Sequence, residues 1–184
     1  MPLTAVTPKP LILVNGKPIV DYAIDNLRSY GVTKFIVNTS YLPQEIIEYL
    51  GDDAIFSYED KPLGTAGAIR KVLPWLGDNF IVTNGDTITN VNYKKMIISH
   101  LRKHALITIF TKDTATHNGG SFIFNKNILH YIPKNKPYSI HEDLIPHLLD
   151  SWVTDRVNLY KSDAYYYDCG NIEKLNKVRE IFKR

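Results

Sequence analysis

The amino-acid sequence predicts an α/β fold in which helices cover a mostly parallel β-sheet. Short apolar runs alternate with segments of helical periodicity along the chain, as expected for this class. Runs such as residues 35–38 and 106–110 lack the polar–apolar alternation of half-exposed strands, which favours strands buried on both faces. With 184 residues, 44% of them apolar, and with no repeat, low-complexity tract or linker, the chain suits a single domain over residues 1–184.

The first half of the chain carries four helical patterns. Residues 18–30 place their apolar side chains on one face, and Gly31 ends the pattern because glycine adopts positive φ without strain. The other helices of this half are expected at residues 43–50, 65–76 and 92–103.

Apolar runs between these helices predict the strands. They are expected at residues 35–38, 54–58, 80–83 and 106–110. The second half is less regular, with a strand at 121–124, a strand-like run at 165–167, and helices at 127–132, 141–149 and 172–182. The last helix repeats apolar residues at every third position, which is typical of a helix that packs onto a core.

Composition argues against several classes of function. The formal net charge of +3, spread along the chain, argues against nucleic-acid binding, which commonly needs a basic stripe. The single cysteine, Cys169, excludes an internal disulfide and, with no leader pattern, favours a reduced, cytoplasmic setting. No apolar run approaches the ~20 residues of a membrane helix, so we expect no membrane partner.

Two aspartates follow strand ends and are candidate metal ligands. Asp86 closes the segment Asn84-Gly85-Asp86, and Asp168 follows a run of three tyrosines. In open α/β sheets ligands bind beyond the carboxyl ends of strands, and two such carboxylates can share one Mg²⁺ ion. Two structural alternatives stay open: a simple turn at Asp86, and capping of the last helix by Asp168.

A small-residue turn and a lysine are candidate phosphate or base contacts. Residues 63–68 enter a helix without bulky side chains, so that the backbone can approach a flat base or a phosphate. The alternative is that Thr65 only caps the helix and that the glycines allow tight packing. Lys9 lies between Pro8 and Pro10 in a stretch expected to be extended, where its ammonium can neutralise a phosphate; a plain surface lysine is the alternative.

Taken in order, these elements resemble the sugar-1-phosphate nucleotidyltransferase family over nearly the whole chain. Residues 2–11 match the second half of the family signature, P-x-T-x-x-x-P-K-P-L, whereas the glycine-rich half, G-G-x-G-T-R, is absent from the sequence. Further matching elements are residues 14–19, 59, 62–68, 84–86, 118–120 and 168–170. The chain looks most similar to mannose- or heptose-1-phosphate guanylyltransferases and N-acetylmuramate-1-phosphate uridylyltransferases.

The resemblance implies a Rossmann-like, doubly wound nucleotidyltransferase fold that lacks its first strand. It implies transfer of a nucleotide from a nucleoside triphosphate to a sugar 1-phosphate, with Mg²⁺ as cofactor and pyrophosphate as the second product; a homo-oligomer is one possible assembly. The implied site residues are Lys9 at the phosphate; Glu59, Gly64, Thr65 and Ala66 at the base; Asp86 and Asp168 at Mg²⁺; and Asn118 and Gly119 at the sugar.

Departures from the family pattern keep a second function open. The glycine-rich loop that cradles the triphosphate is missing, and the short segment before Asn118 leaves no counterpart for a Glu–Lys pair that contacts the sugar phosphate. His141 stands where the family has an acidic residue. The alternative function is therefore a non-catalytic module that binds a nucleotide or sugar phosphate, or regulates, without its phosphate-binding loops.

Overall fold

A computed structural model describes residues 7–112, 118–134 and 136–183. Near the N-terminus, a 3₁₀ turn, η2 (Lys9–Leu11), precedes a hairpin of β1 (Leu13–Val14) and β2 (Lys17–Pro18), and α1 (Ile19–Ser29) follows directly. Asn15 and Gly16 form the two-residue hairpin turn with φ values of 48° and 77°, the conformation that Asn-Gly favours. This hairpin was not predicted, although Asn-Gly is its usual signal.

Two parallel strands form a small sheet of their own. β3 (Ile36–Thr39) and β4 (Ile55–Tyr58) pair in parallel, with α2 (Pro43–Leu50) and the 3₁₀ turn η3 (Gly51–Asp53) between them. The strands and the helix confirm the predicted elements at 35–38, 43–50 and 54–58, with boundaries that agree within one residue.

A four-stranded sheet forms the centre of the fold. Its order is β5 (Asn79–Thr83), β8 (Asn118–Asn125), β7 (Ile107–Thr111) and β9 (Val157–Lys161). β8 is antiparallel to both of its neighbours and β9 is parallel to β7, so three of these four strands run in one direction. The mostly parallel arrangement is therefore confirmed. β9 was not predicted because it lies at the edge of the sheet and its residues are only partly buried or exposed.

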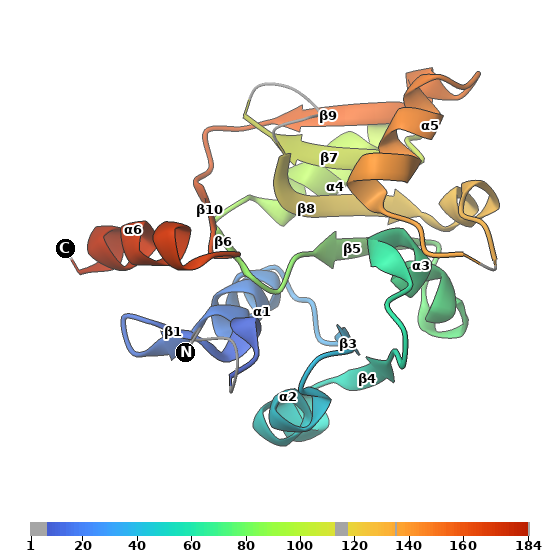
Figure 1. The fold of residues 1–184 in the computed structure, drawn as a ribbon. Coiled ribbons are helices and arrows are strands. Elements are labelled where there is room, and N and C mark those ends of the chain that lie inside the picture. The colour runs from blue at the N-terminus through green and yellow to red at the C-terminus, as the bar shows by residue number, and fades with distance from the viewer. Residues whose placement is uncertain (1–6, 113–117, 135, 184) are drawn as a thin grey trace.

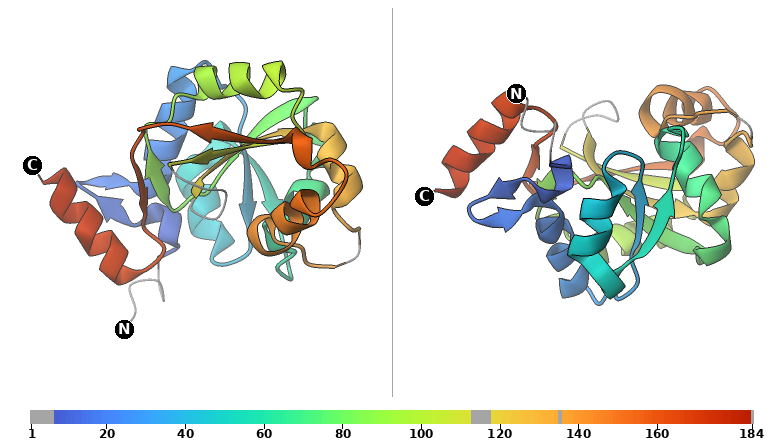
Figure 2. Two further views of the ribbon diagram at one scale, coloured as in Figure 1. Left: turned by 90° about the horizontal axis from the view of Figure 1, so that it is seen from above. Right: turned by 60° about the horizontal axis from the view of Figure 1, so that its bottom comes forward.

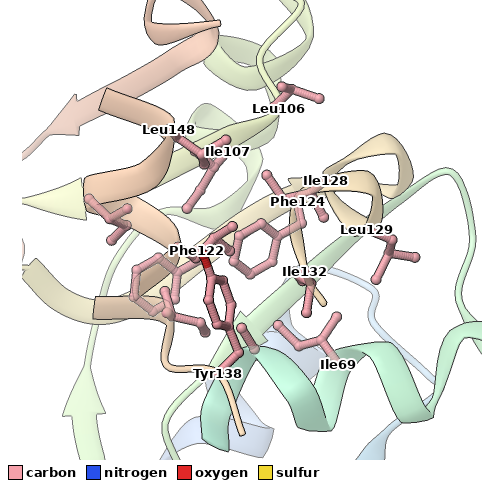
Figure 3. Packing of buried hydrophobic residues seen from close by; sticks show 14 of the residues in the cluster. Ile69, Leu106, Ile107, Phe122, Phe124, Ile128, Leu129, Ile132, Tyr138 and Leu148 are labelled. Carbon is pink, nitrogen blue, oxygen red and sulfur yellow. The ribbon is translucent and has the colours of Figure 1, made fainter. Parts of the chain in front are cut away.

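Helices cover both faces of the four-stranded sheet (Figure 2, left). α4 (Tyr93–Arg102) packs on one face, and α3 (Gly64–Lys71) and α5 (Ile145–Leu149) lie on the other. Alternation along β8 serves both layers, since Ile123 belongs to the α4 cluster whereas Phe122 and Phe124 belong to the opposite one. Figure 3 shows this second cluster, in which the two phenylalanine rings stack 5.9 Å apart.

A third pair of strands joins the end of the chain to its middle. β6 (Thr87–Thr89) pairs antiparallel with β10 (Tyr166–Asp168), and α6 (Ile172–Phe182) follows and packs against β1 and β10 (Figure 1). The predicted closing helix at 172–182 is confirmed. No helix among the described residues is long and apolar enough to cross a membrane.

Three predicted helices differ from the observed elements, and proline explains two of the differences. α3 ends at Lys71 and a 3₁₀ turn, η4 (Leu73–Trp75), replaces its expected last turn, because Pro74 has no N–H for the helical ladder. The expected helix at 141–149 is a π-helical turn, η6 (Ile140–Leu144), followed by α5, with Pro146 at the junction. The segment predicted as a helix at 127–132 is the 3₁₀ helix η5 (Lys126–Tyr131).

Candidate functional site

The turn between β5 and β6 places Asp86. Asn84 donates its backbone N–H to the Gly120 carbonyl oxygen over 2.9 Å, which fixes the start of the turn against β8. A Cβ added at Gly85 would lie 3.5 Å from Pro10 Cγ, so the N-terminal 3₁₀ turn packs directly on this glycine. Asp86 thus lies in a turn, as the structural alternative expected, and that turn is held by two distant segments.

The pairing of β6 with β10 brings Asp168 beside Asp86. Asp168 is in register with Thr87, and the Cys169 N–H donates to the Asp86 carbonyl oxygen over 2.9 Å. A Cβ added at Gly170 would lie 2.9 Å from Asp168 Oδ1 and 3.4 Å from Asp86 Oδ2. Both carboxylates therefore converge on Gly170, and a side chain at this position would crowd the oxygen of Asp168.

Each oxygen of the Asp168 carboxylate accepts a hydrogen bond. The Gly170 N–H donates to Oδ1 over 2.7 Å, and Lys174 Nζ donates to Oδ2 over 2.5 Å. The interpretation of Asp168 as the cap of α6 is wrong, because the Asn171 side chain accepts from the Lys174 backbone N–H and occupies that role. The Asp168 carboxylate is consequently not engaged in capping α6.

The two carboxylates have opposite electrostatic settings. Burial, and then the charge of Asp168, raise the pKa of Asp86 above its ordinary value. Partial burial also acts to raise the pKa of Asp168, but the hydrogen bonds from Lys174 and Gly170 outweigh it and leave this pKa lowered. The pair therefore combines a half-buried carboxylate that gains from an added positive charge, Asp86, with a carboxylate that is already paired with a lysine, Asp168.

Lys9 belongs to the same group of charges. Its side chain is exposed, and its ammonium favours the ionised forms of both Asp86 and Asp168. The expectation of an extended backbone at Lys9 is wrong. Lys9 begins a 3₁₀ turn closed by the Leu11 N–H on Pro8 O (2.9 Å) and the Ile12 N–H on Lys9 O (3.1 Å). Pro10 is tolerated in the first turn because its missing N–H has no partner there.

The candidate base-binding residues form a second group. Glu59 is only 4% exposed; its Oε2 accepts from the Leu63 N–H over 2.9 Å, and its Oε1 has no hydrogen-bond partner among the described residues. Gly64 has φ of 74° and meets the backbone of Tyr138 so closely that an added Cβ would lie 2.6 Å from its carbonyl oxygen. A side chain at position 64 would therefore clash with this segment as well as strain the backbone.

Thr65 and Ala66 connect this turn by hydrogen bonds to the start of η6 and to Tyr138 just before it. Thr65 Oγ1 accepts from the Ile140 N–H over 2.8 Å, and the Ala66 N–H donates to Tyr138 O over 2.9 Å. The alternative that Thr65 caps α3 is wrong, since the cap position is Leu63 and no side chain bonds there. The tight packing that the same alternative expected of the glycines is present, since Gly64 lies directly against the Tyr138 backbone. In this structure Thr65 thus joins two parts of the chain rather than capping the start of α3.

The candidate sugar residues begin β8. The Asn118 backbone is opposite Thr111 in the β7–β8 pair, and its side chain lies outside the described residues. Gly119 is buried against the Phe110 ring, to which an added Cβ would approach within 2.3 Å. Gly119 is adjacent to Gly120, which contacts Asn84, so the start of β8 lies beside the turn that carries Asp86.

Sequence reasoning missed two residues of the acidic group, Gly170 and Lys174. Gly170 was noted only as part of the Asp-Cys-Gly match, and Lys174 was not considered. A usable signal was present for Lys174: Asn171 is a typical helix cap, which places Lys174 in the first helical turn, facing back toward Asp168.

The donors of the acidic group fit Mg²⁺. The ion prefers oxygen ligands and is commonly held by one or two carboxylates, with water and phosphate completing its shell. Among the described residues no group of three or more His, Cys, Asp and Glu side chains is placed to hold a metal. Burial raises the pKa of Cys169 to about 11, so this neighbouring thiol is protonated at neutral pH, and its sulfur is a softer donor than the oxygens that Mg²⁺ prefers.

Comparison with known proteins relates this geometry to one family. The family described as nucleotidyl transferase matches residues 1–119. An N-acetylmuramate alpha-1-phosphate uridylyltransferase of Neisseria meningitidis is 34% identical over 127 residues, which are 64% of this chain and 55% of that protein. A D-glycero-alpha-D-manno-heptose 1-phosphate guanylyltransferase of Aneurinibacillus thermoaerophilus is 26% identical over 206 residues, covering 94% of this chain and 88% of the relative.

The fold is shared with a solved structure of the same kind. HddC from Yersinia pseudotuberculosis superposes with a TM-score of 0.78 at 28% identity and covers 98% of this chain and 93% of that one. The same protein has been solved in complex with GMP-PN. The chain spans about half the length of the Neisseria relative and most of the other two. Since the family match extends over well over half of its residues, this chain belongs to the nucleotidyl transferase family, and its relatives are sugar-1-phosphate nucleotidyltransferases.

Proposed function

We propose that this chain transfers a nucleotidyl group from a nucleoside triphosphate to a sugar 1-phosphate and releases pyrophosphate. The observation that carries the proposal is the convergence of Asp86 and Asp168 on Gly170, with Lys9 and Lys174 acting on the same carboxylates. Family membership supports this reaction over other uses of an acidic pair.

The reaction requires positioning and charge neutralisation more than covalent help from the protein. An oxygen of the sugar phosphate attacks the α-phosphorus of the triphosphate, and the bond from that phosphorus to the pyrophosphate oxygen breaks. Asp86 and Asp168 would hold Mg²⁺, which supplies positive charge to the phosphate oxygens when bound. The exposed ammonium of Lys9 would contact the phosphates and oppose the charge that builds up on the leaving group.

The base and the sugar would be recognised by the other two groups. Glu59 Oε1 is a buried acceptor without a partner among the described residues, so an N–H of the base would satisfy it. Gly64, which lies next to the Leu63 N–H that Glu59 accepts from, packs against the backbone of Tyr138 and so holds this turn in place. Asn118 and Gly119 are proposed at the sugar, next to the turn of Asp86. The similarity of residues 63–68 and 84–87 to guanylyl- and uridylyl-transferring members favours guanine or uracil.

The test is release of pyrophosphate by the chain as given and by a version extended at its N-terminus with a strand and a G-G-x-G-T-R loop, the first half of the family signature. Each is supplied with Mg²⁺, GTP or UTP, and a panel of mannose, heptose and N-acetylmuramate 1-phosphates. Asp168→Asn should lower the rate of pyrophosphate release by at least about a hundredfold. The control Asp163→Asn, at an exposed aspartate five positions earlier in the chain, should not change this rate.

The outcomes separate catalysis from binding alone. Turnover that depends on Asp86 and Asp168 supports the proposal. Nucleotide binding by both versions without any pyrophosphate release overturns it and favours a non-catalytic binding module.

A further inference from the structure

Lys174 forms an ion pair with Asp168, one of the two candidate metal ligands. Its backbone N–H donates to Asn171 Oδ1 over 2.9 Å, which fixes the first turn of α6. From there its side chain extends back and its Nζ donates to Asp168 Oδ2 over 2.5 Å, while the Gly170 N–H holds Oδ1. In this structure both oxygens of Asp168 are therefore already bound by donors.

The charges around the acidic pair balance without a metal. Asp86 and Asp168 carry two negative charges, and the ammonium groups of Lys9 and Lys174 favour the ionised form of each. Lys174 lies in contact with one carboxylate and its charge reaches the other. A divalent cation that binds the same oxygens would place three positive charges within a few ångströms, so the cation and this ammonium repel each other.

The ion pair between Lys174 and Asp168 is weak enough to be displaced. The Lys174 and Asp168 side chains are 51% and 44% exposed, and ion pairs at such exposure are weak because water competes for both partners. The lysine carries its charge on a flexible stem of four carbons, so that it can leave Asp168 without moving α6. A displaced ammonium stays beside the acidic pair, where phosphates that bind the cation would arrive.

We propose that Lys174 is a mobile cation of this site, which neutralises Asp168 when no metal is bound and contacts the polyphosphate once a divalent cation has displaced it. The inference rests on the proposed function of the acidic pair as the metal site. It adds Lys174, from the helix α6, as a second phosphate-binding lysine beside Lys9, which lies near the beginning of the sequence.

α6 supplies a matched control. Lys177 donates to Glu173 over 2.7 Å, but both side chains are more than 70% exposed and Glu173 has no described role in the site. Lys177→Met therefore removes the same charge from the same helix without uncovering Asp168.

The test measures two affinities in the full chain, for Mn²⁺ alone by electron paramagnetic resonance and for inorganic pyrophosphate at saturating Mg²⁺ by calorimetry. Lys174→Met should bind Mn²⁺ about three to five times more tightly, because the competitor is gone. It should bind pyrophosphate at least about threefold more weakly, because a cationic contact is lost. Lys177→Met should leave both affinities unchanged. Thermal melting checks that α6 remains folded, and Lys174→Gln serves as a second variant.

The outcomes distinguish this inference from the proposed function. Unchanged Mn²⁺ affinity or unchanged pyrophosphate affinity in both Lys174 variants overturns the role of the lysine, even where Asp168→Asn abolishes Mn²⁺ binding and so upholds the metal site. Mn²⁺ binding that survives in Asp86→Asn and Asp168→Asn overturns the metal site, and the inference with it.

Discussion

Protonation of His100 should destabilise the fold between pH 6.5 and pH 4. His100 lies on α4, is 1% exposed and joins two strands, with Nδ1 2.8 Å from Thr108 Oγ1 and Nε2 3.2 Å from Asn79 Oδ1. Because an amide oxygen only accepts, Nε2 carries the proton and Nδ1 accepts from the Thr108 hydroxyl. A second proton on the ring would turn the Thr108 hydroxyl from donor to acceptor and place a positive charge in a buried position.

The size of this loss of stability follows from the pKa of His100. Burial, and then the charge of Arg156, lower the pKa of His100 to about 4, from an ordinary value of 6.5. The unfolded chain therefore takes up a proton at a pH where the folded chain does not, and stability falls as the pH drops from about 6.5 toward 4. At about 1.4 kcal/mol per pKa unit, the loss amounts to about 3 kcal/mol at the lower end.

The assay is urea denaturation at intervals from pH 7 to pH 4.5, for the unchanged chain and for His100→Gln. Glutamine keeps polar atoms near Thr108 and Asn79 but does not titrate, so the variant should be less stable at pH 7 and lose less on acidification. The lowered pKa of His141 contributes a similar slope to both proteins and cancels in the comparison. Equal pH dependence of the two proteins would refute the assignment of the slope to His100.

Three further predictions concern the glycines and the acidic pair. Gly64→Ala should lower the free energy of unfolding by more than the ~1 kcal/mol expected for Gly31→Ala. Both glycines have positive φ, but only at Gly64 would an added Cβ meet a backbone oxygen, at 2.6 Å. Equal losses of stability in chemical denaturation would contradict this. Gly119→Ala should cost about 1–3 kcal/mol because its Cβ would lie 2.3 Å from the Phe110 ring, and an unchanged melting curve would disprove that overpacking. Asp86→Asn should raise the free energy of unfolding at pH 7 without metal, and this gain should shrink as the pH falls toward 4. The reason is that the raised pKa of Asp86 means that folding disfavours its ionised form. A gain that does not depend on pH in urea titrations would count against this cause.

The sequence carried enough local information to predict the class of fold. Apolar periodicity, helix-ending glycines and turn residues act over a few neighbours, and these signals placed α1, α2, α4 and α6 correctly. It also carried the family resemblance, because the motif residues keep their order and type along the chain. Errors arose where one proline changed the local geometry, as at Pro74 in the turn after α3.

The tertiary structure decided which of these residues meet. Asp86 and Asp168 lie far apart in the sequence, and only the antiparallel pairing of β6 with β10 sets their carboxylates against Gly170. The partner of Lys174, and the burial that raises the pKa of Asp86, likewise follow from contacts between distant segments. Residue types and spacing thus determined the chemistry available to this chain, whereas strand pairing and packing determined where that chemistry converges, because they alone fix distances between residues remote in sequence.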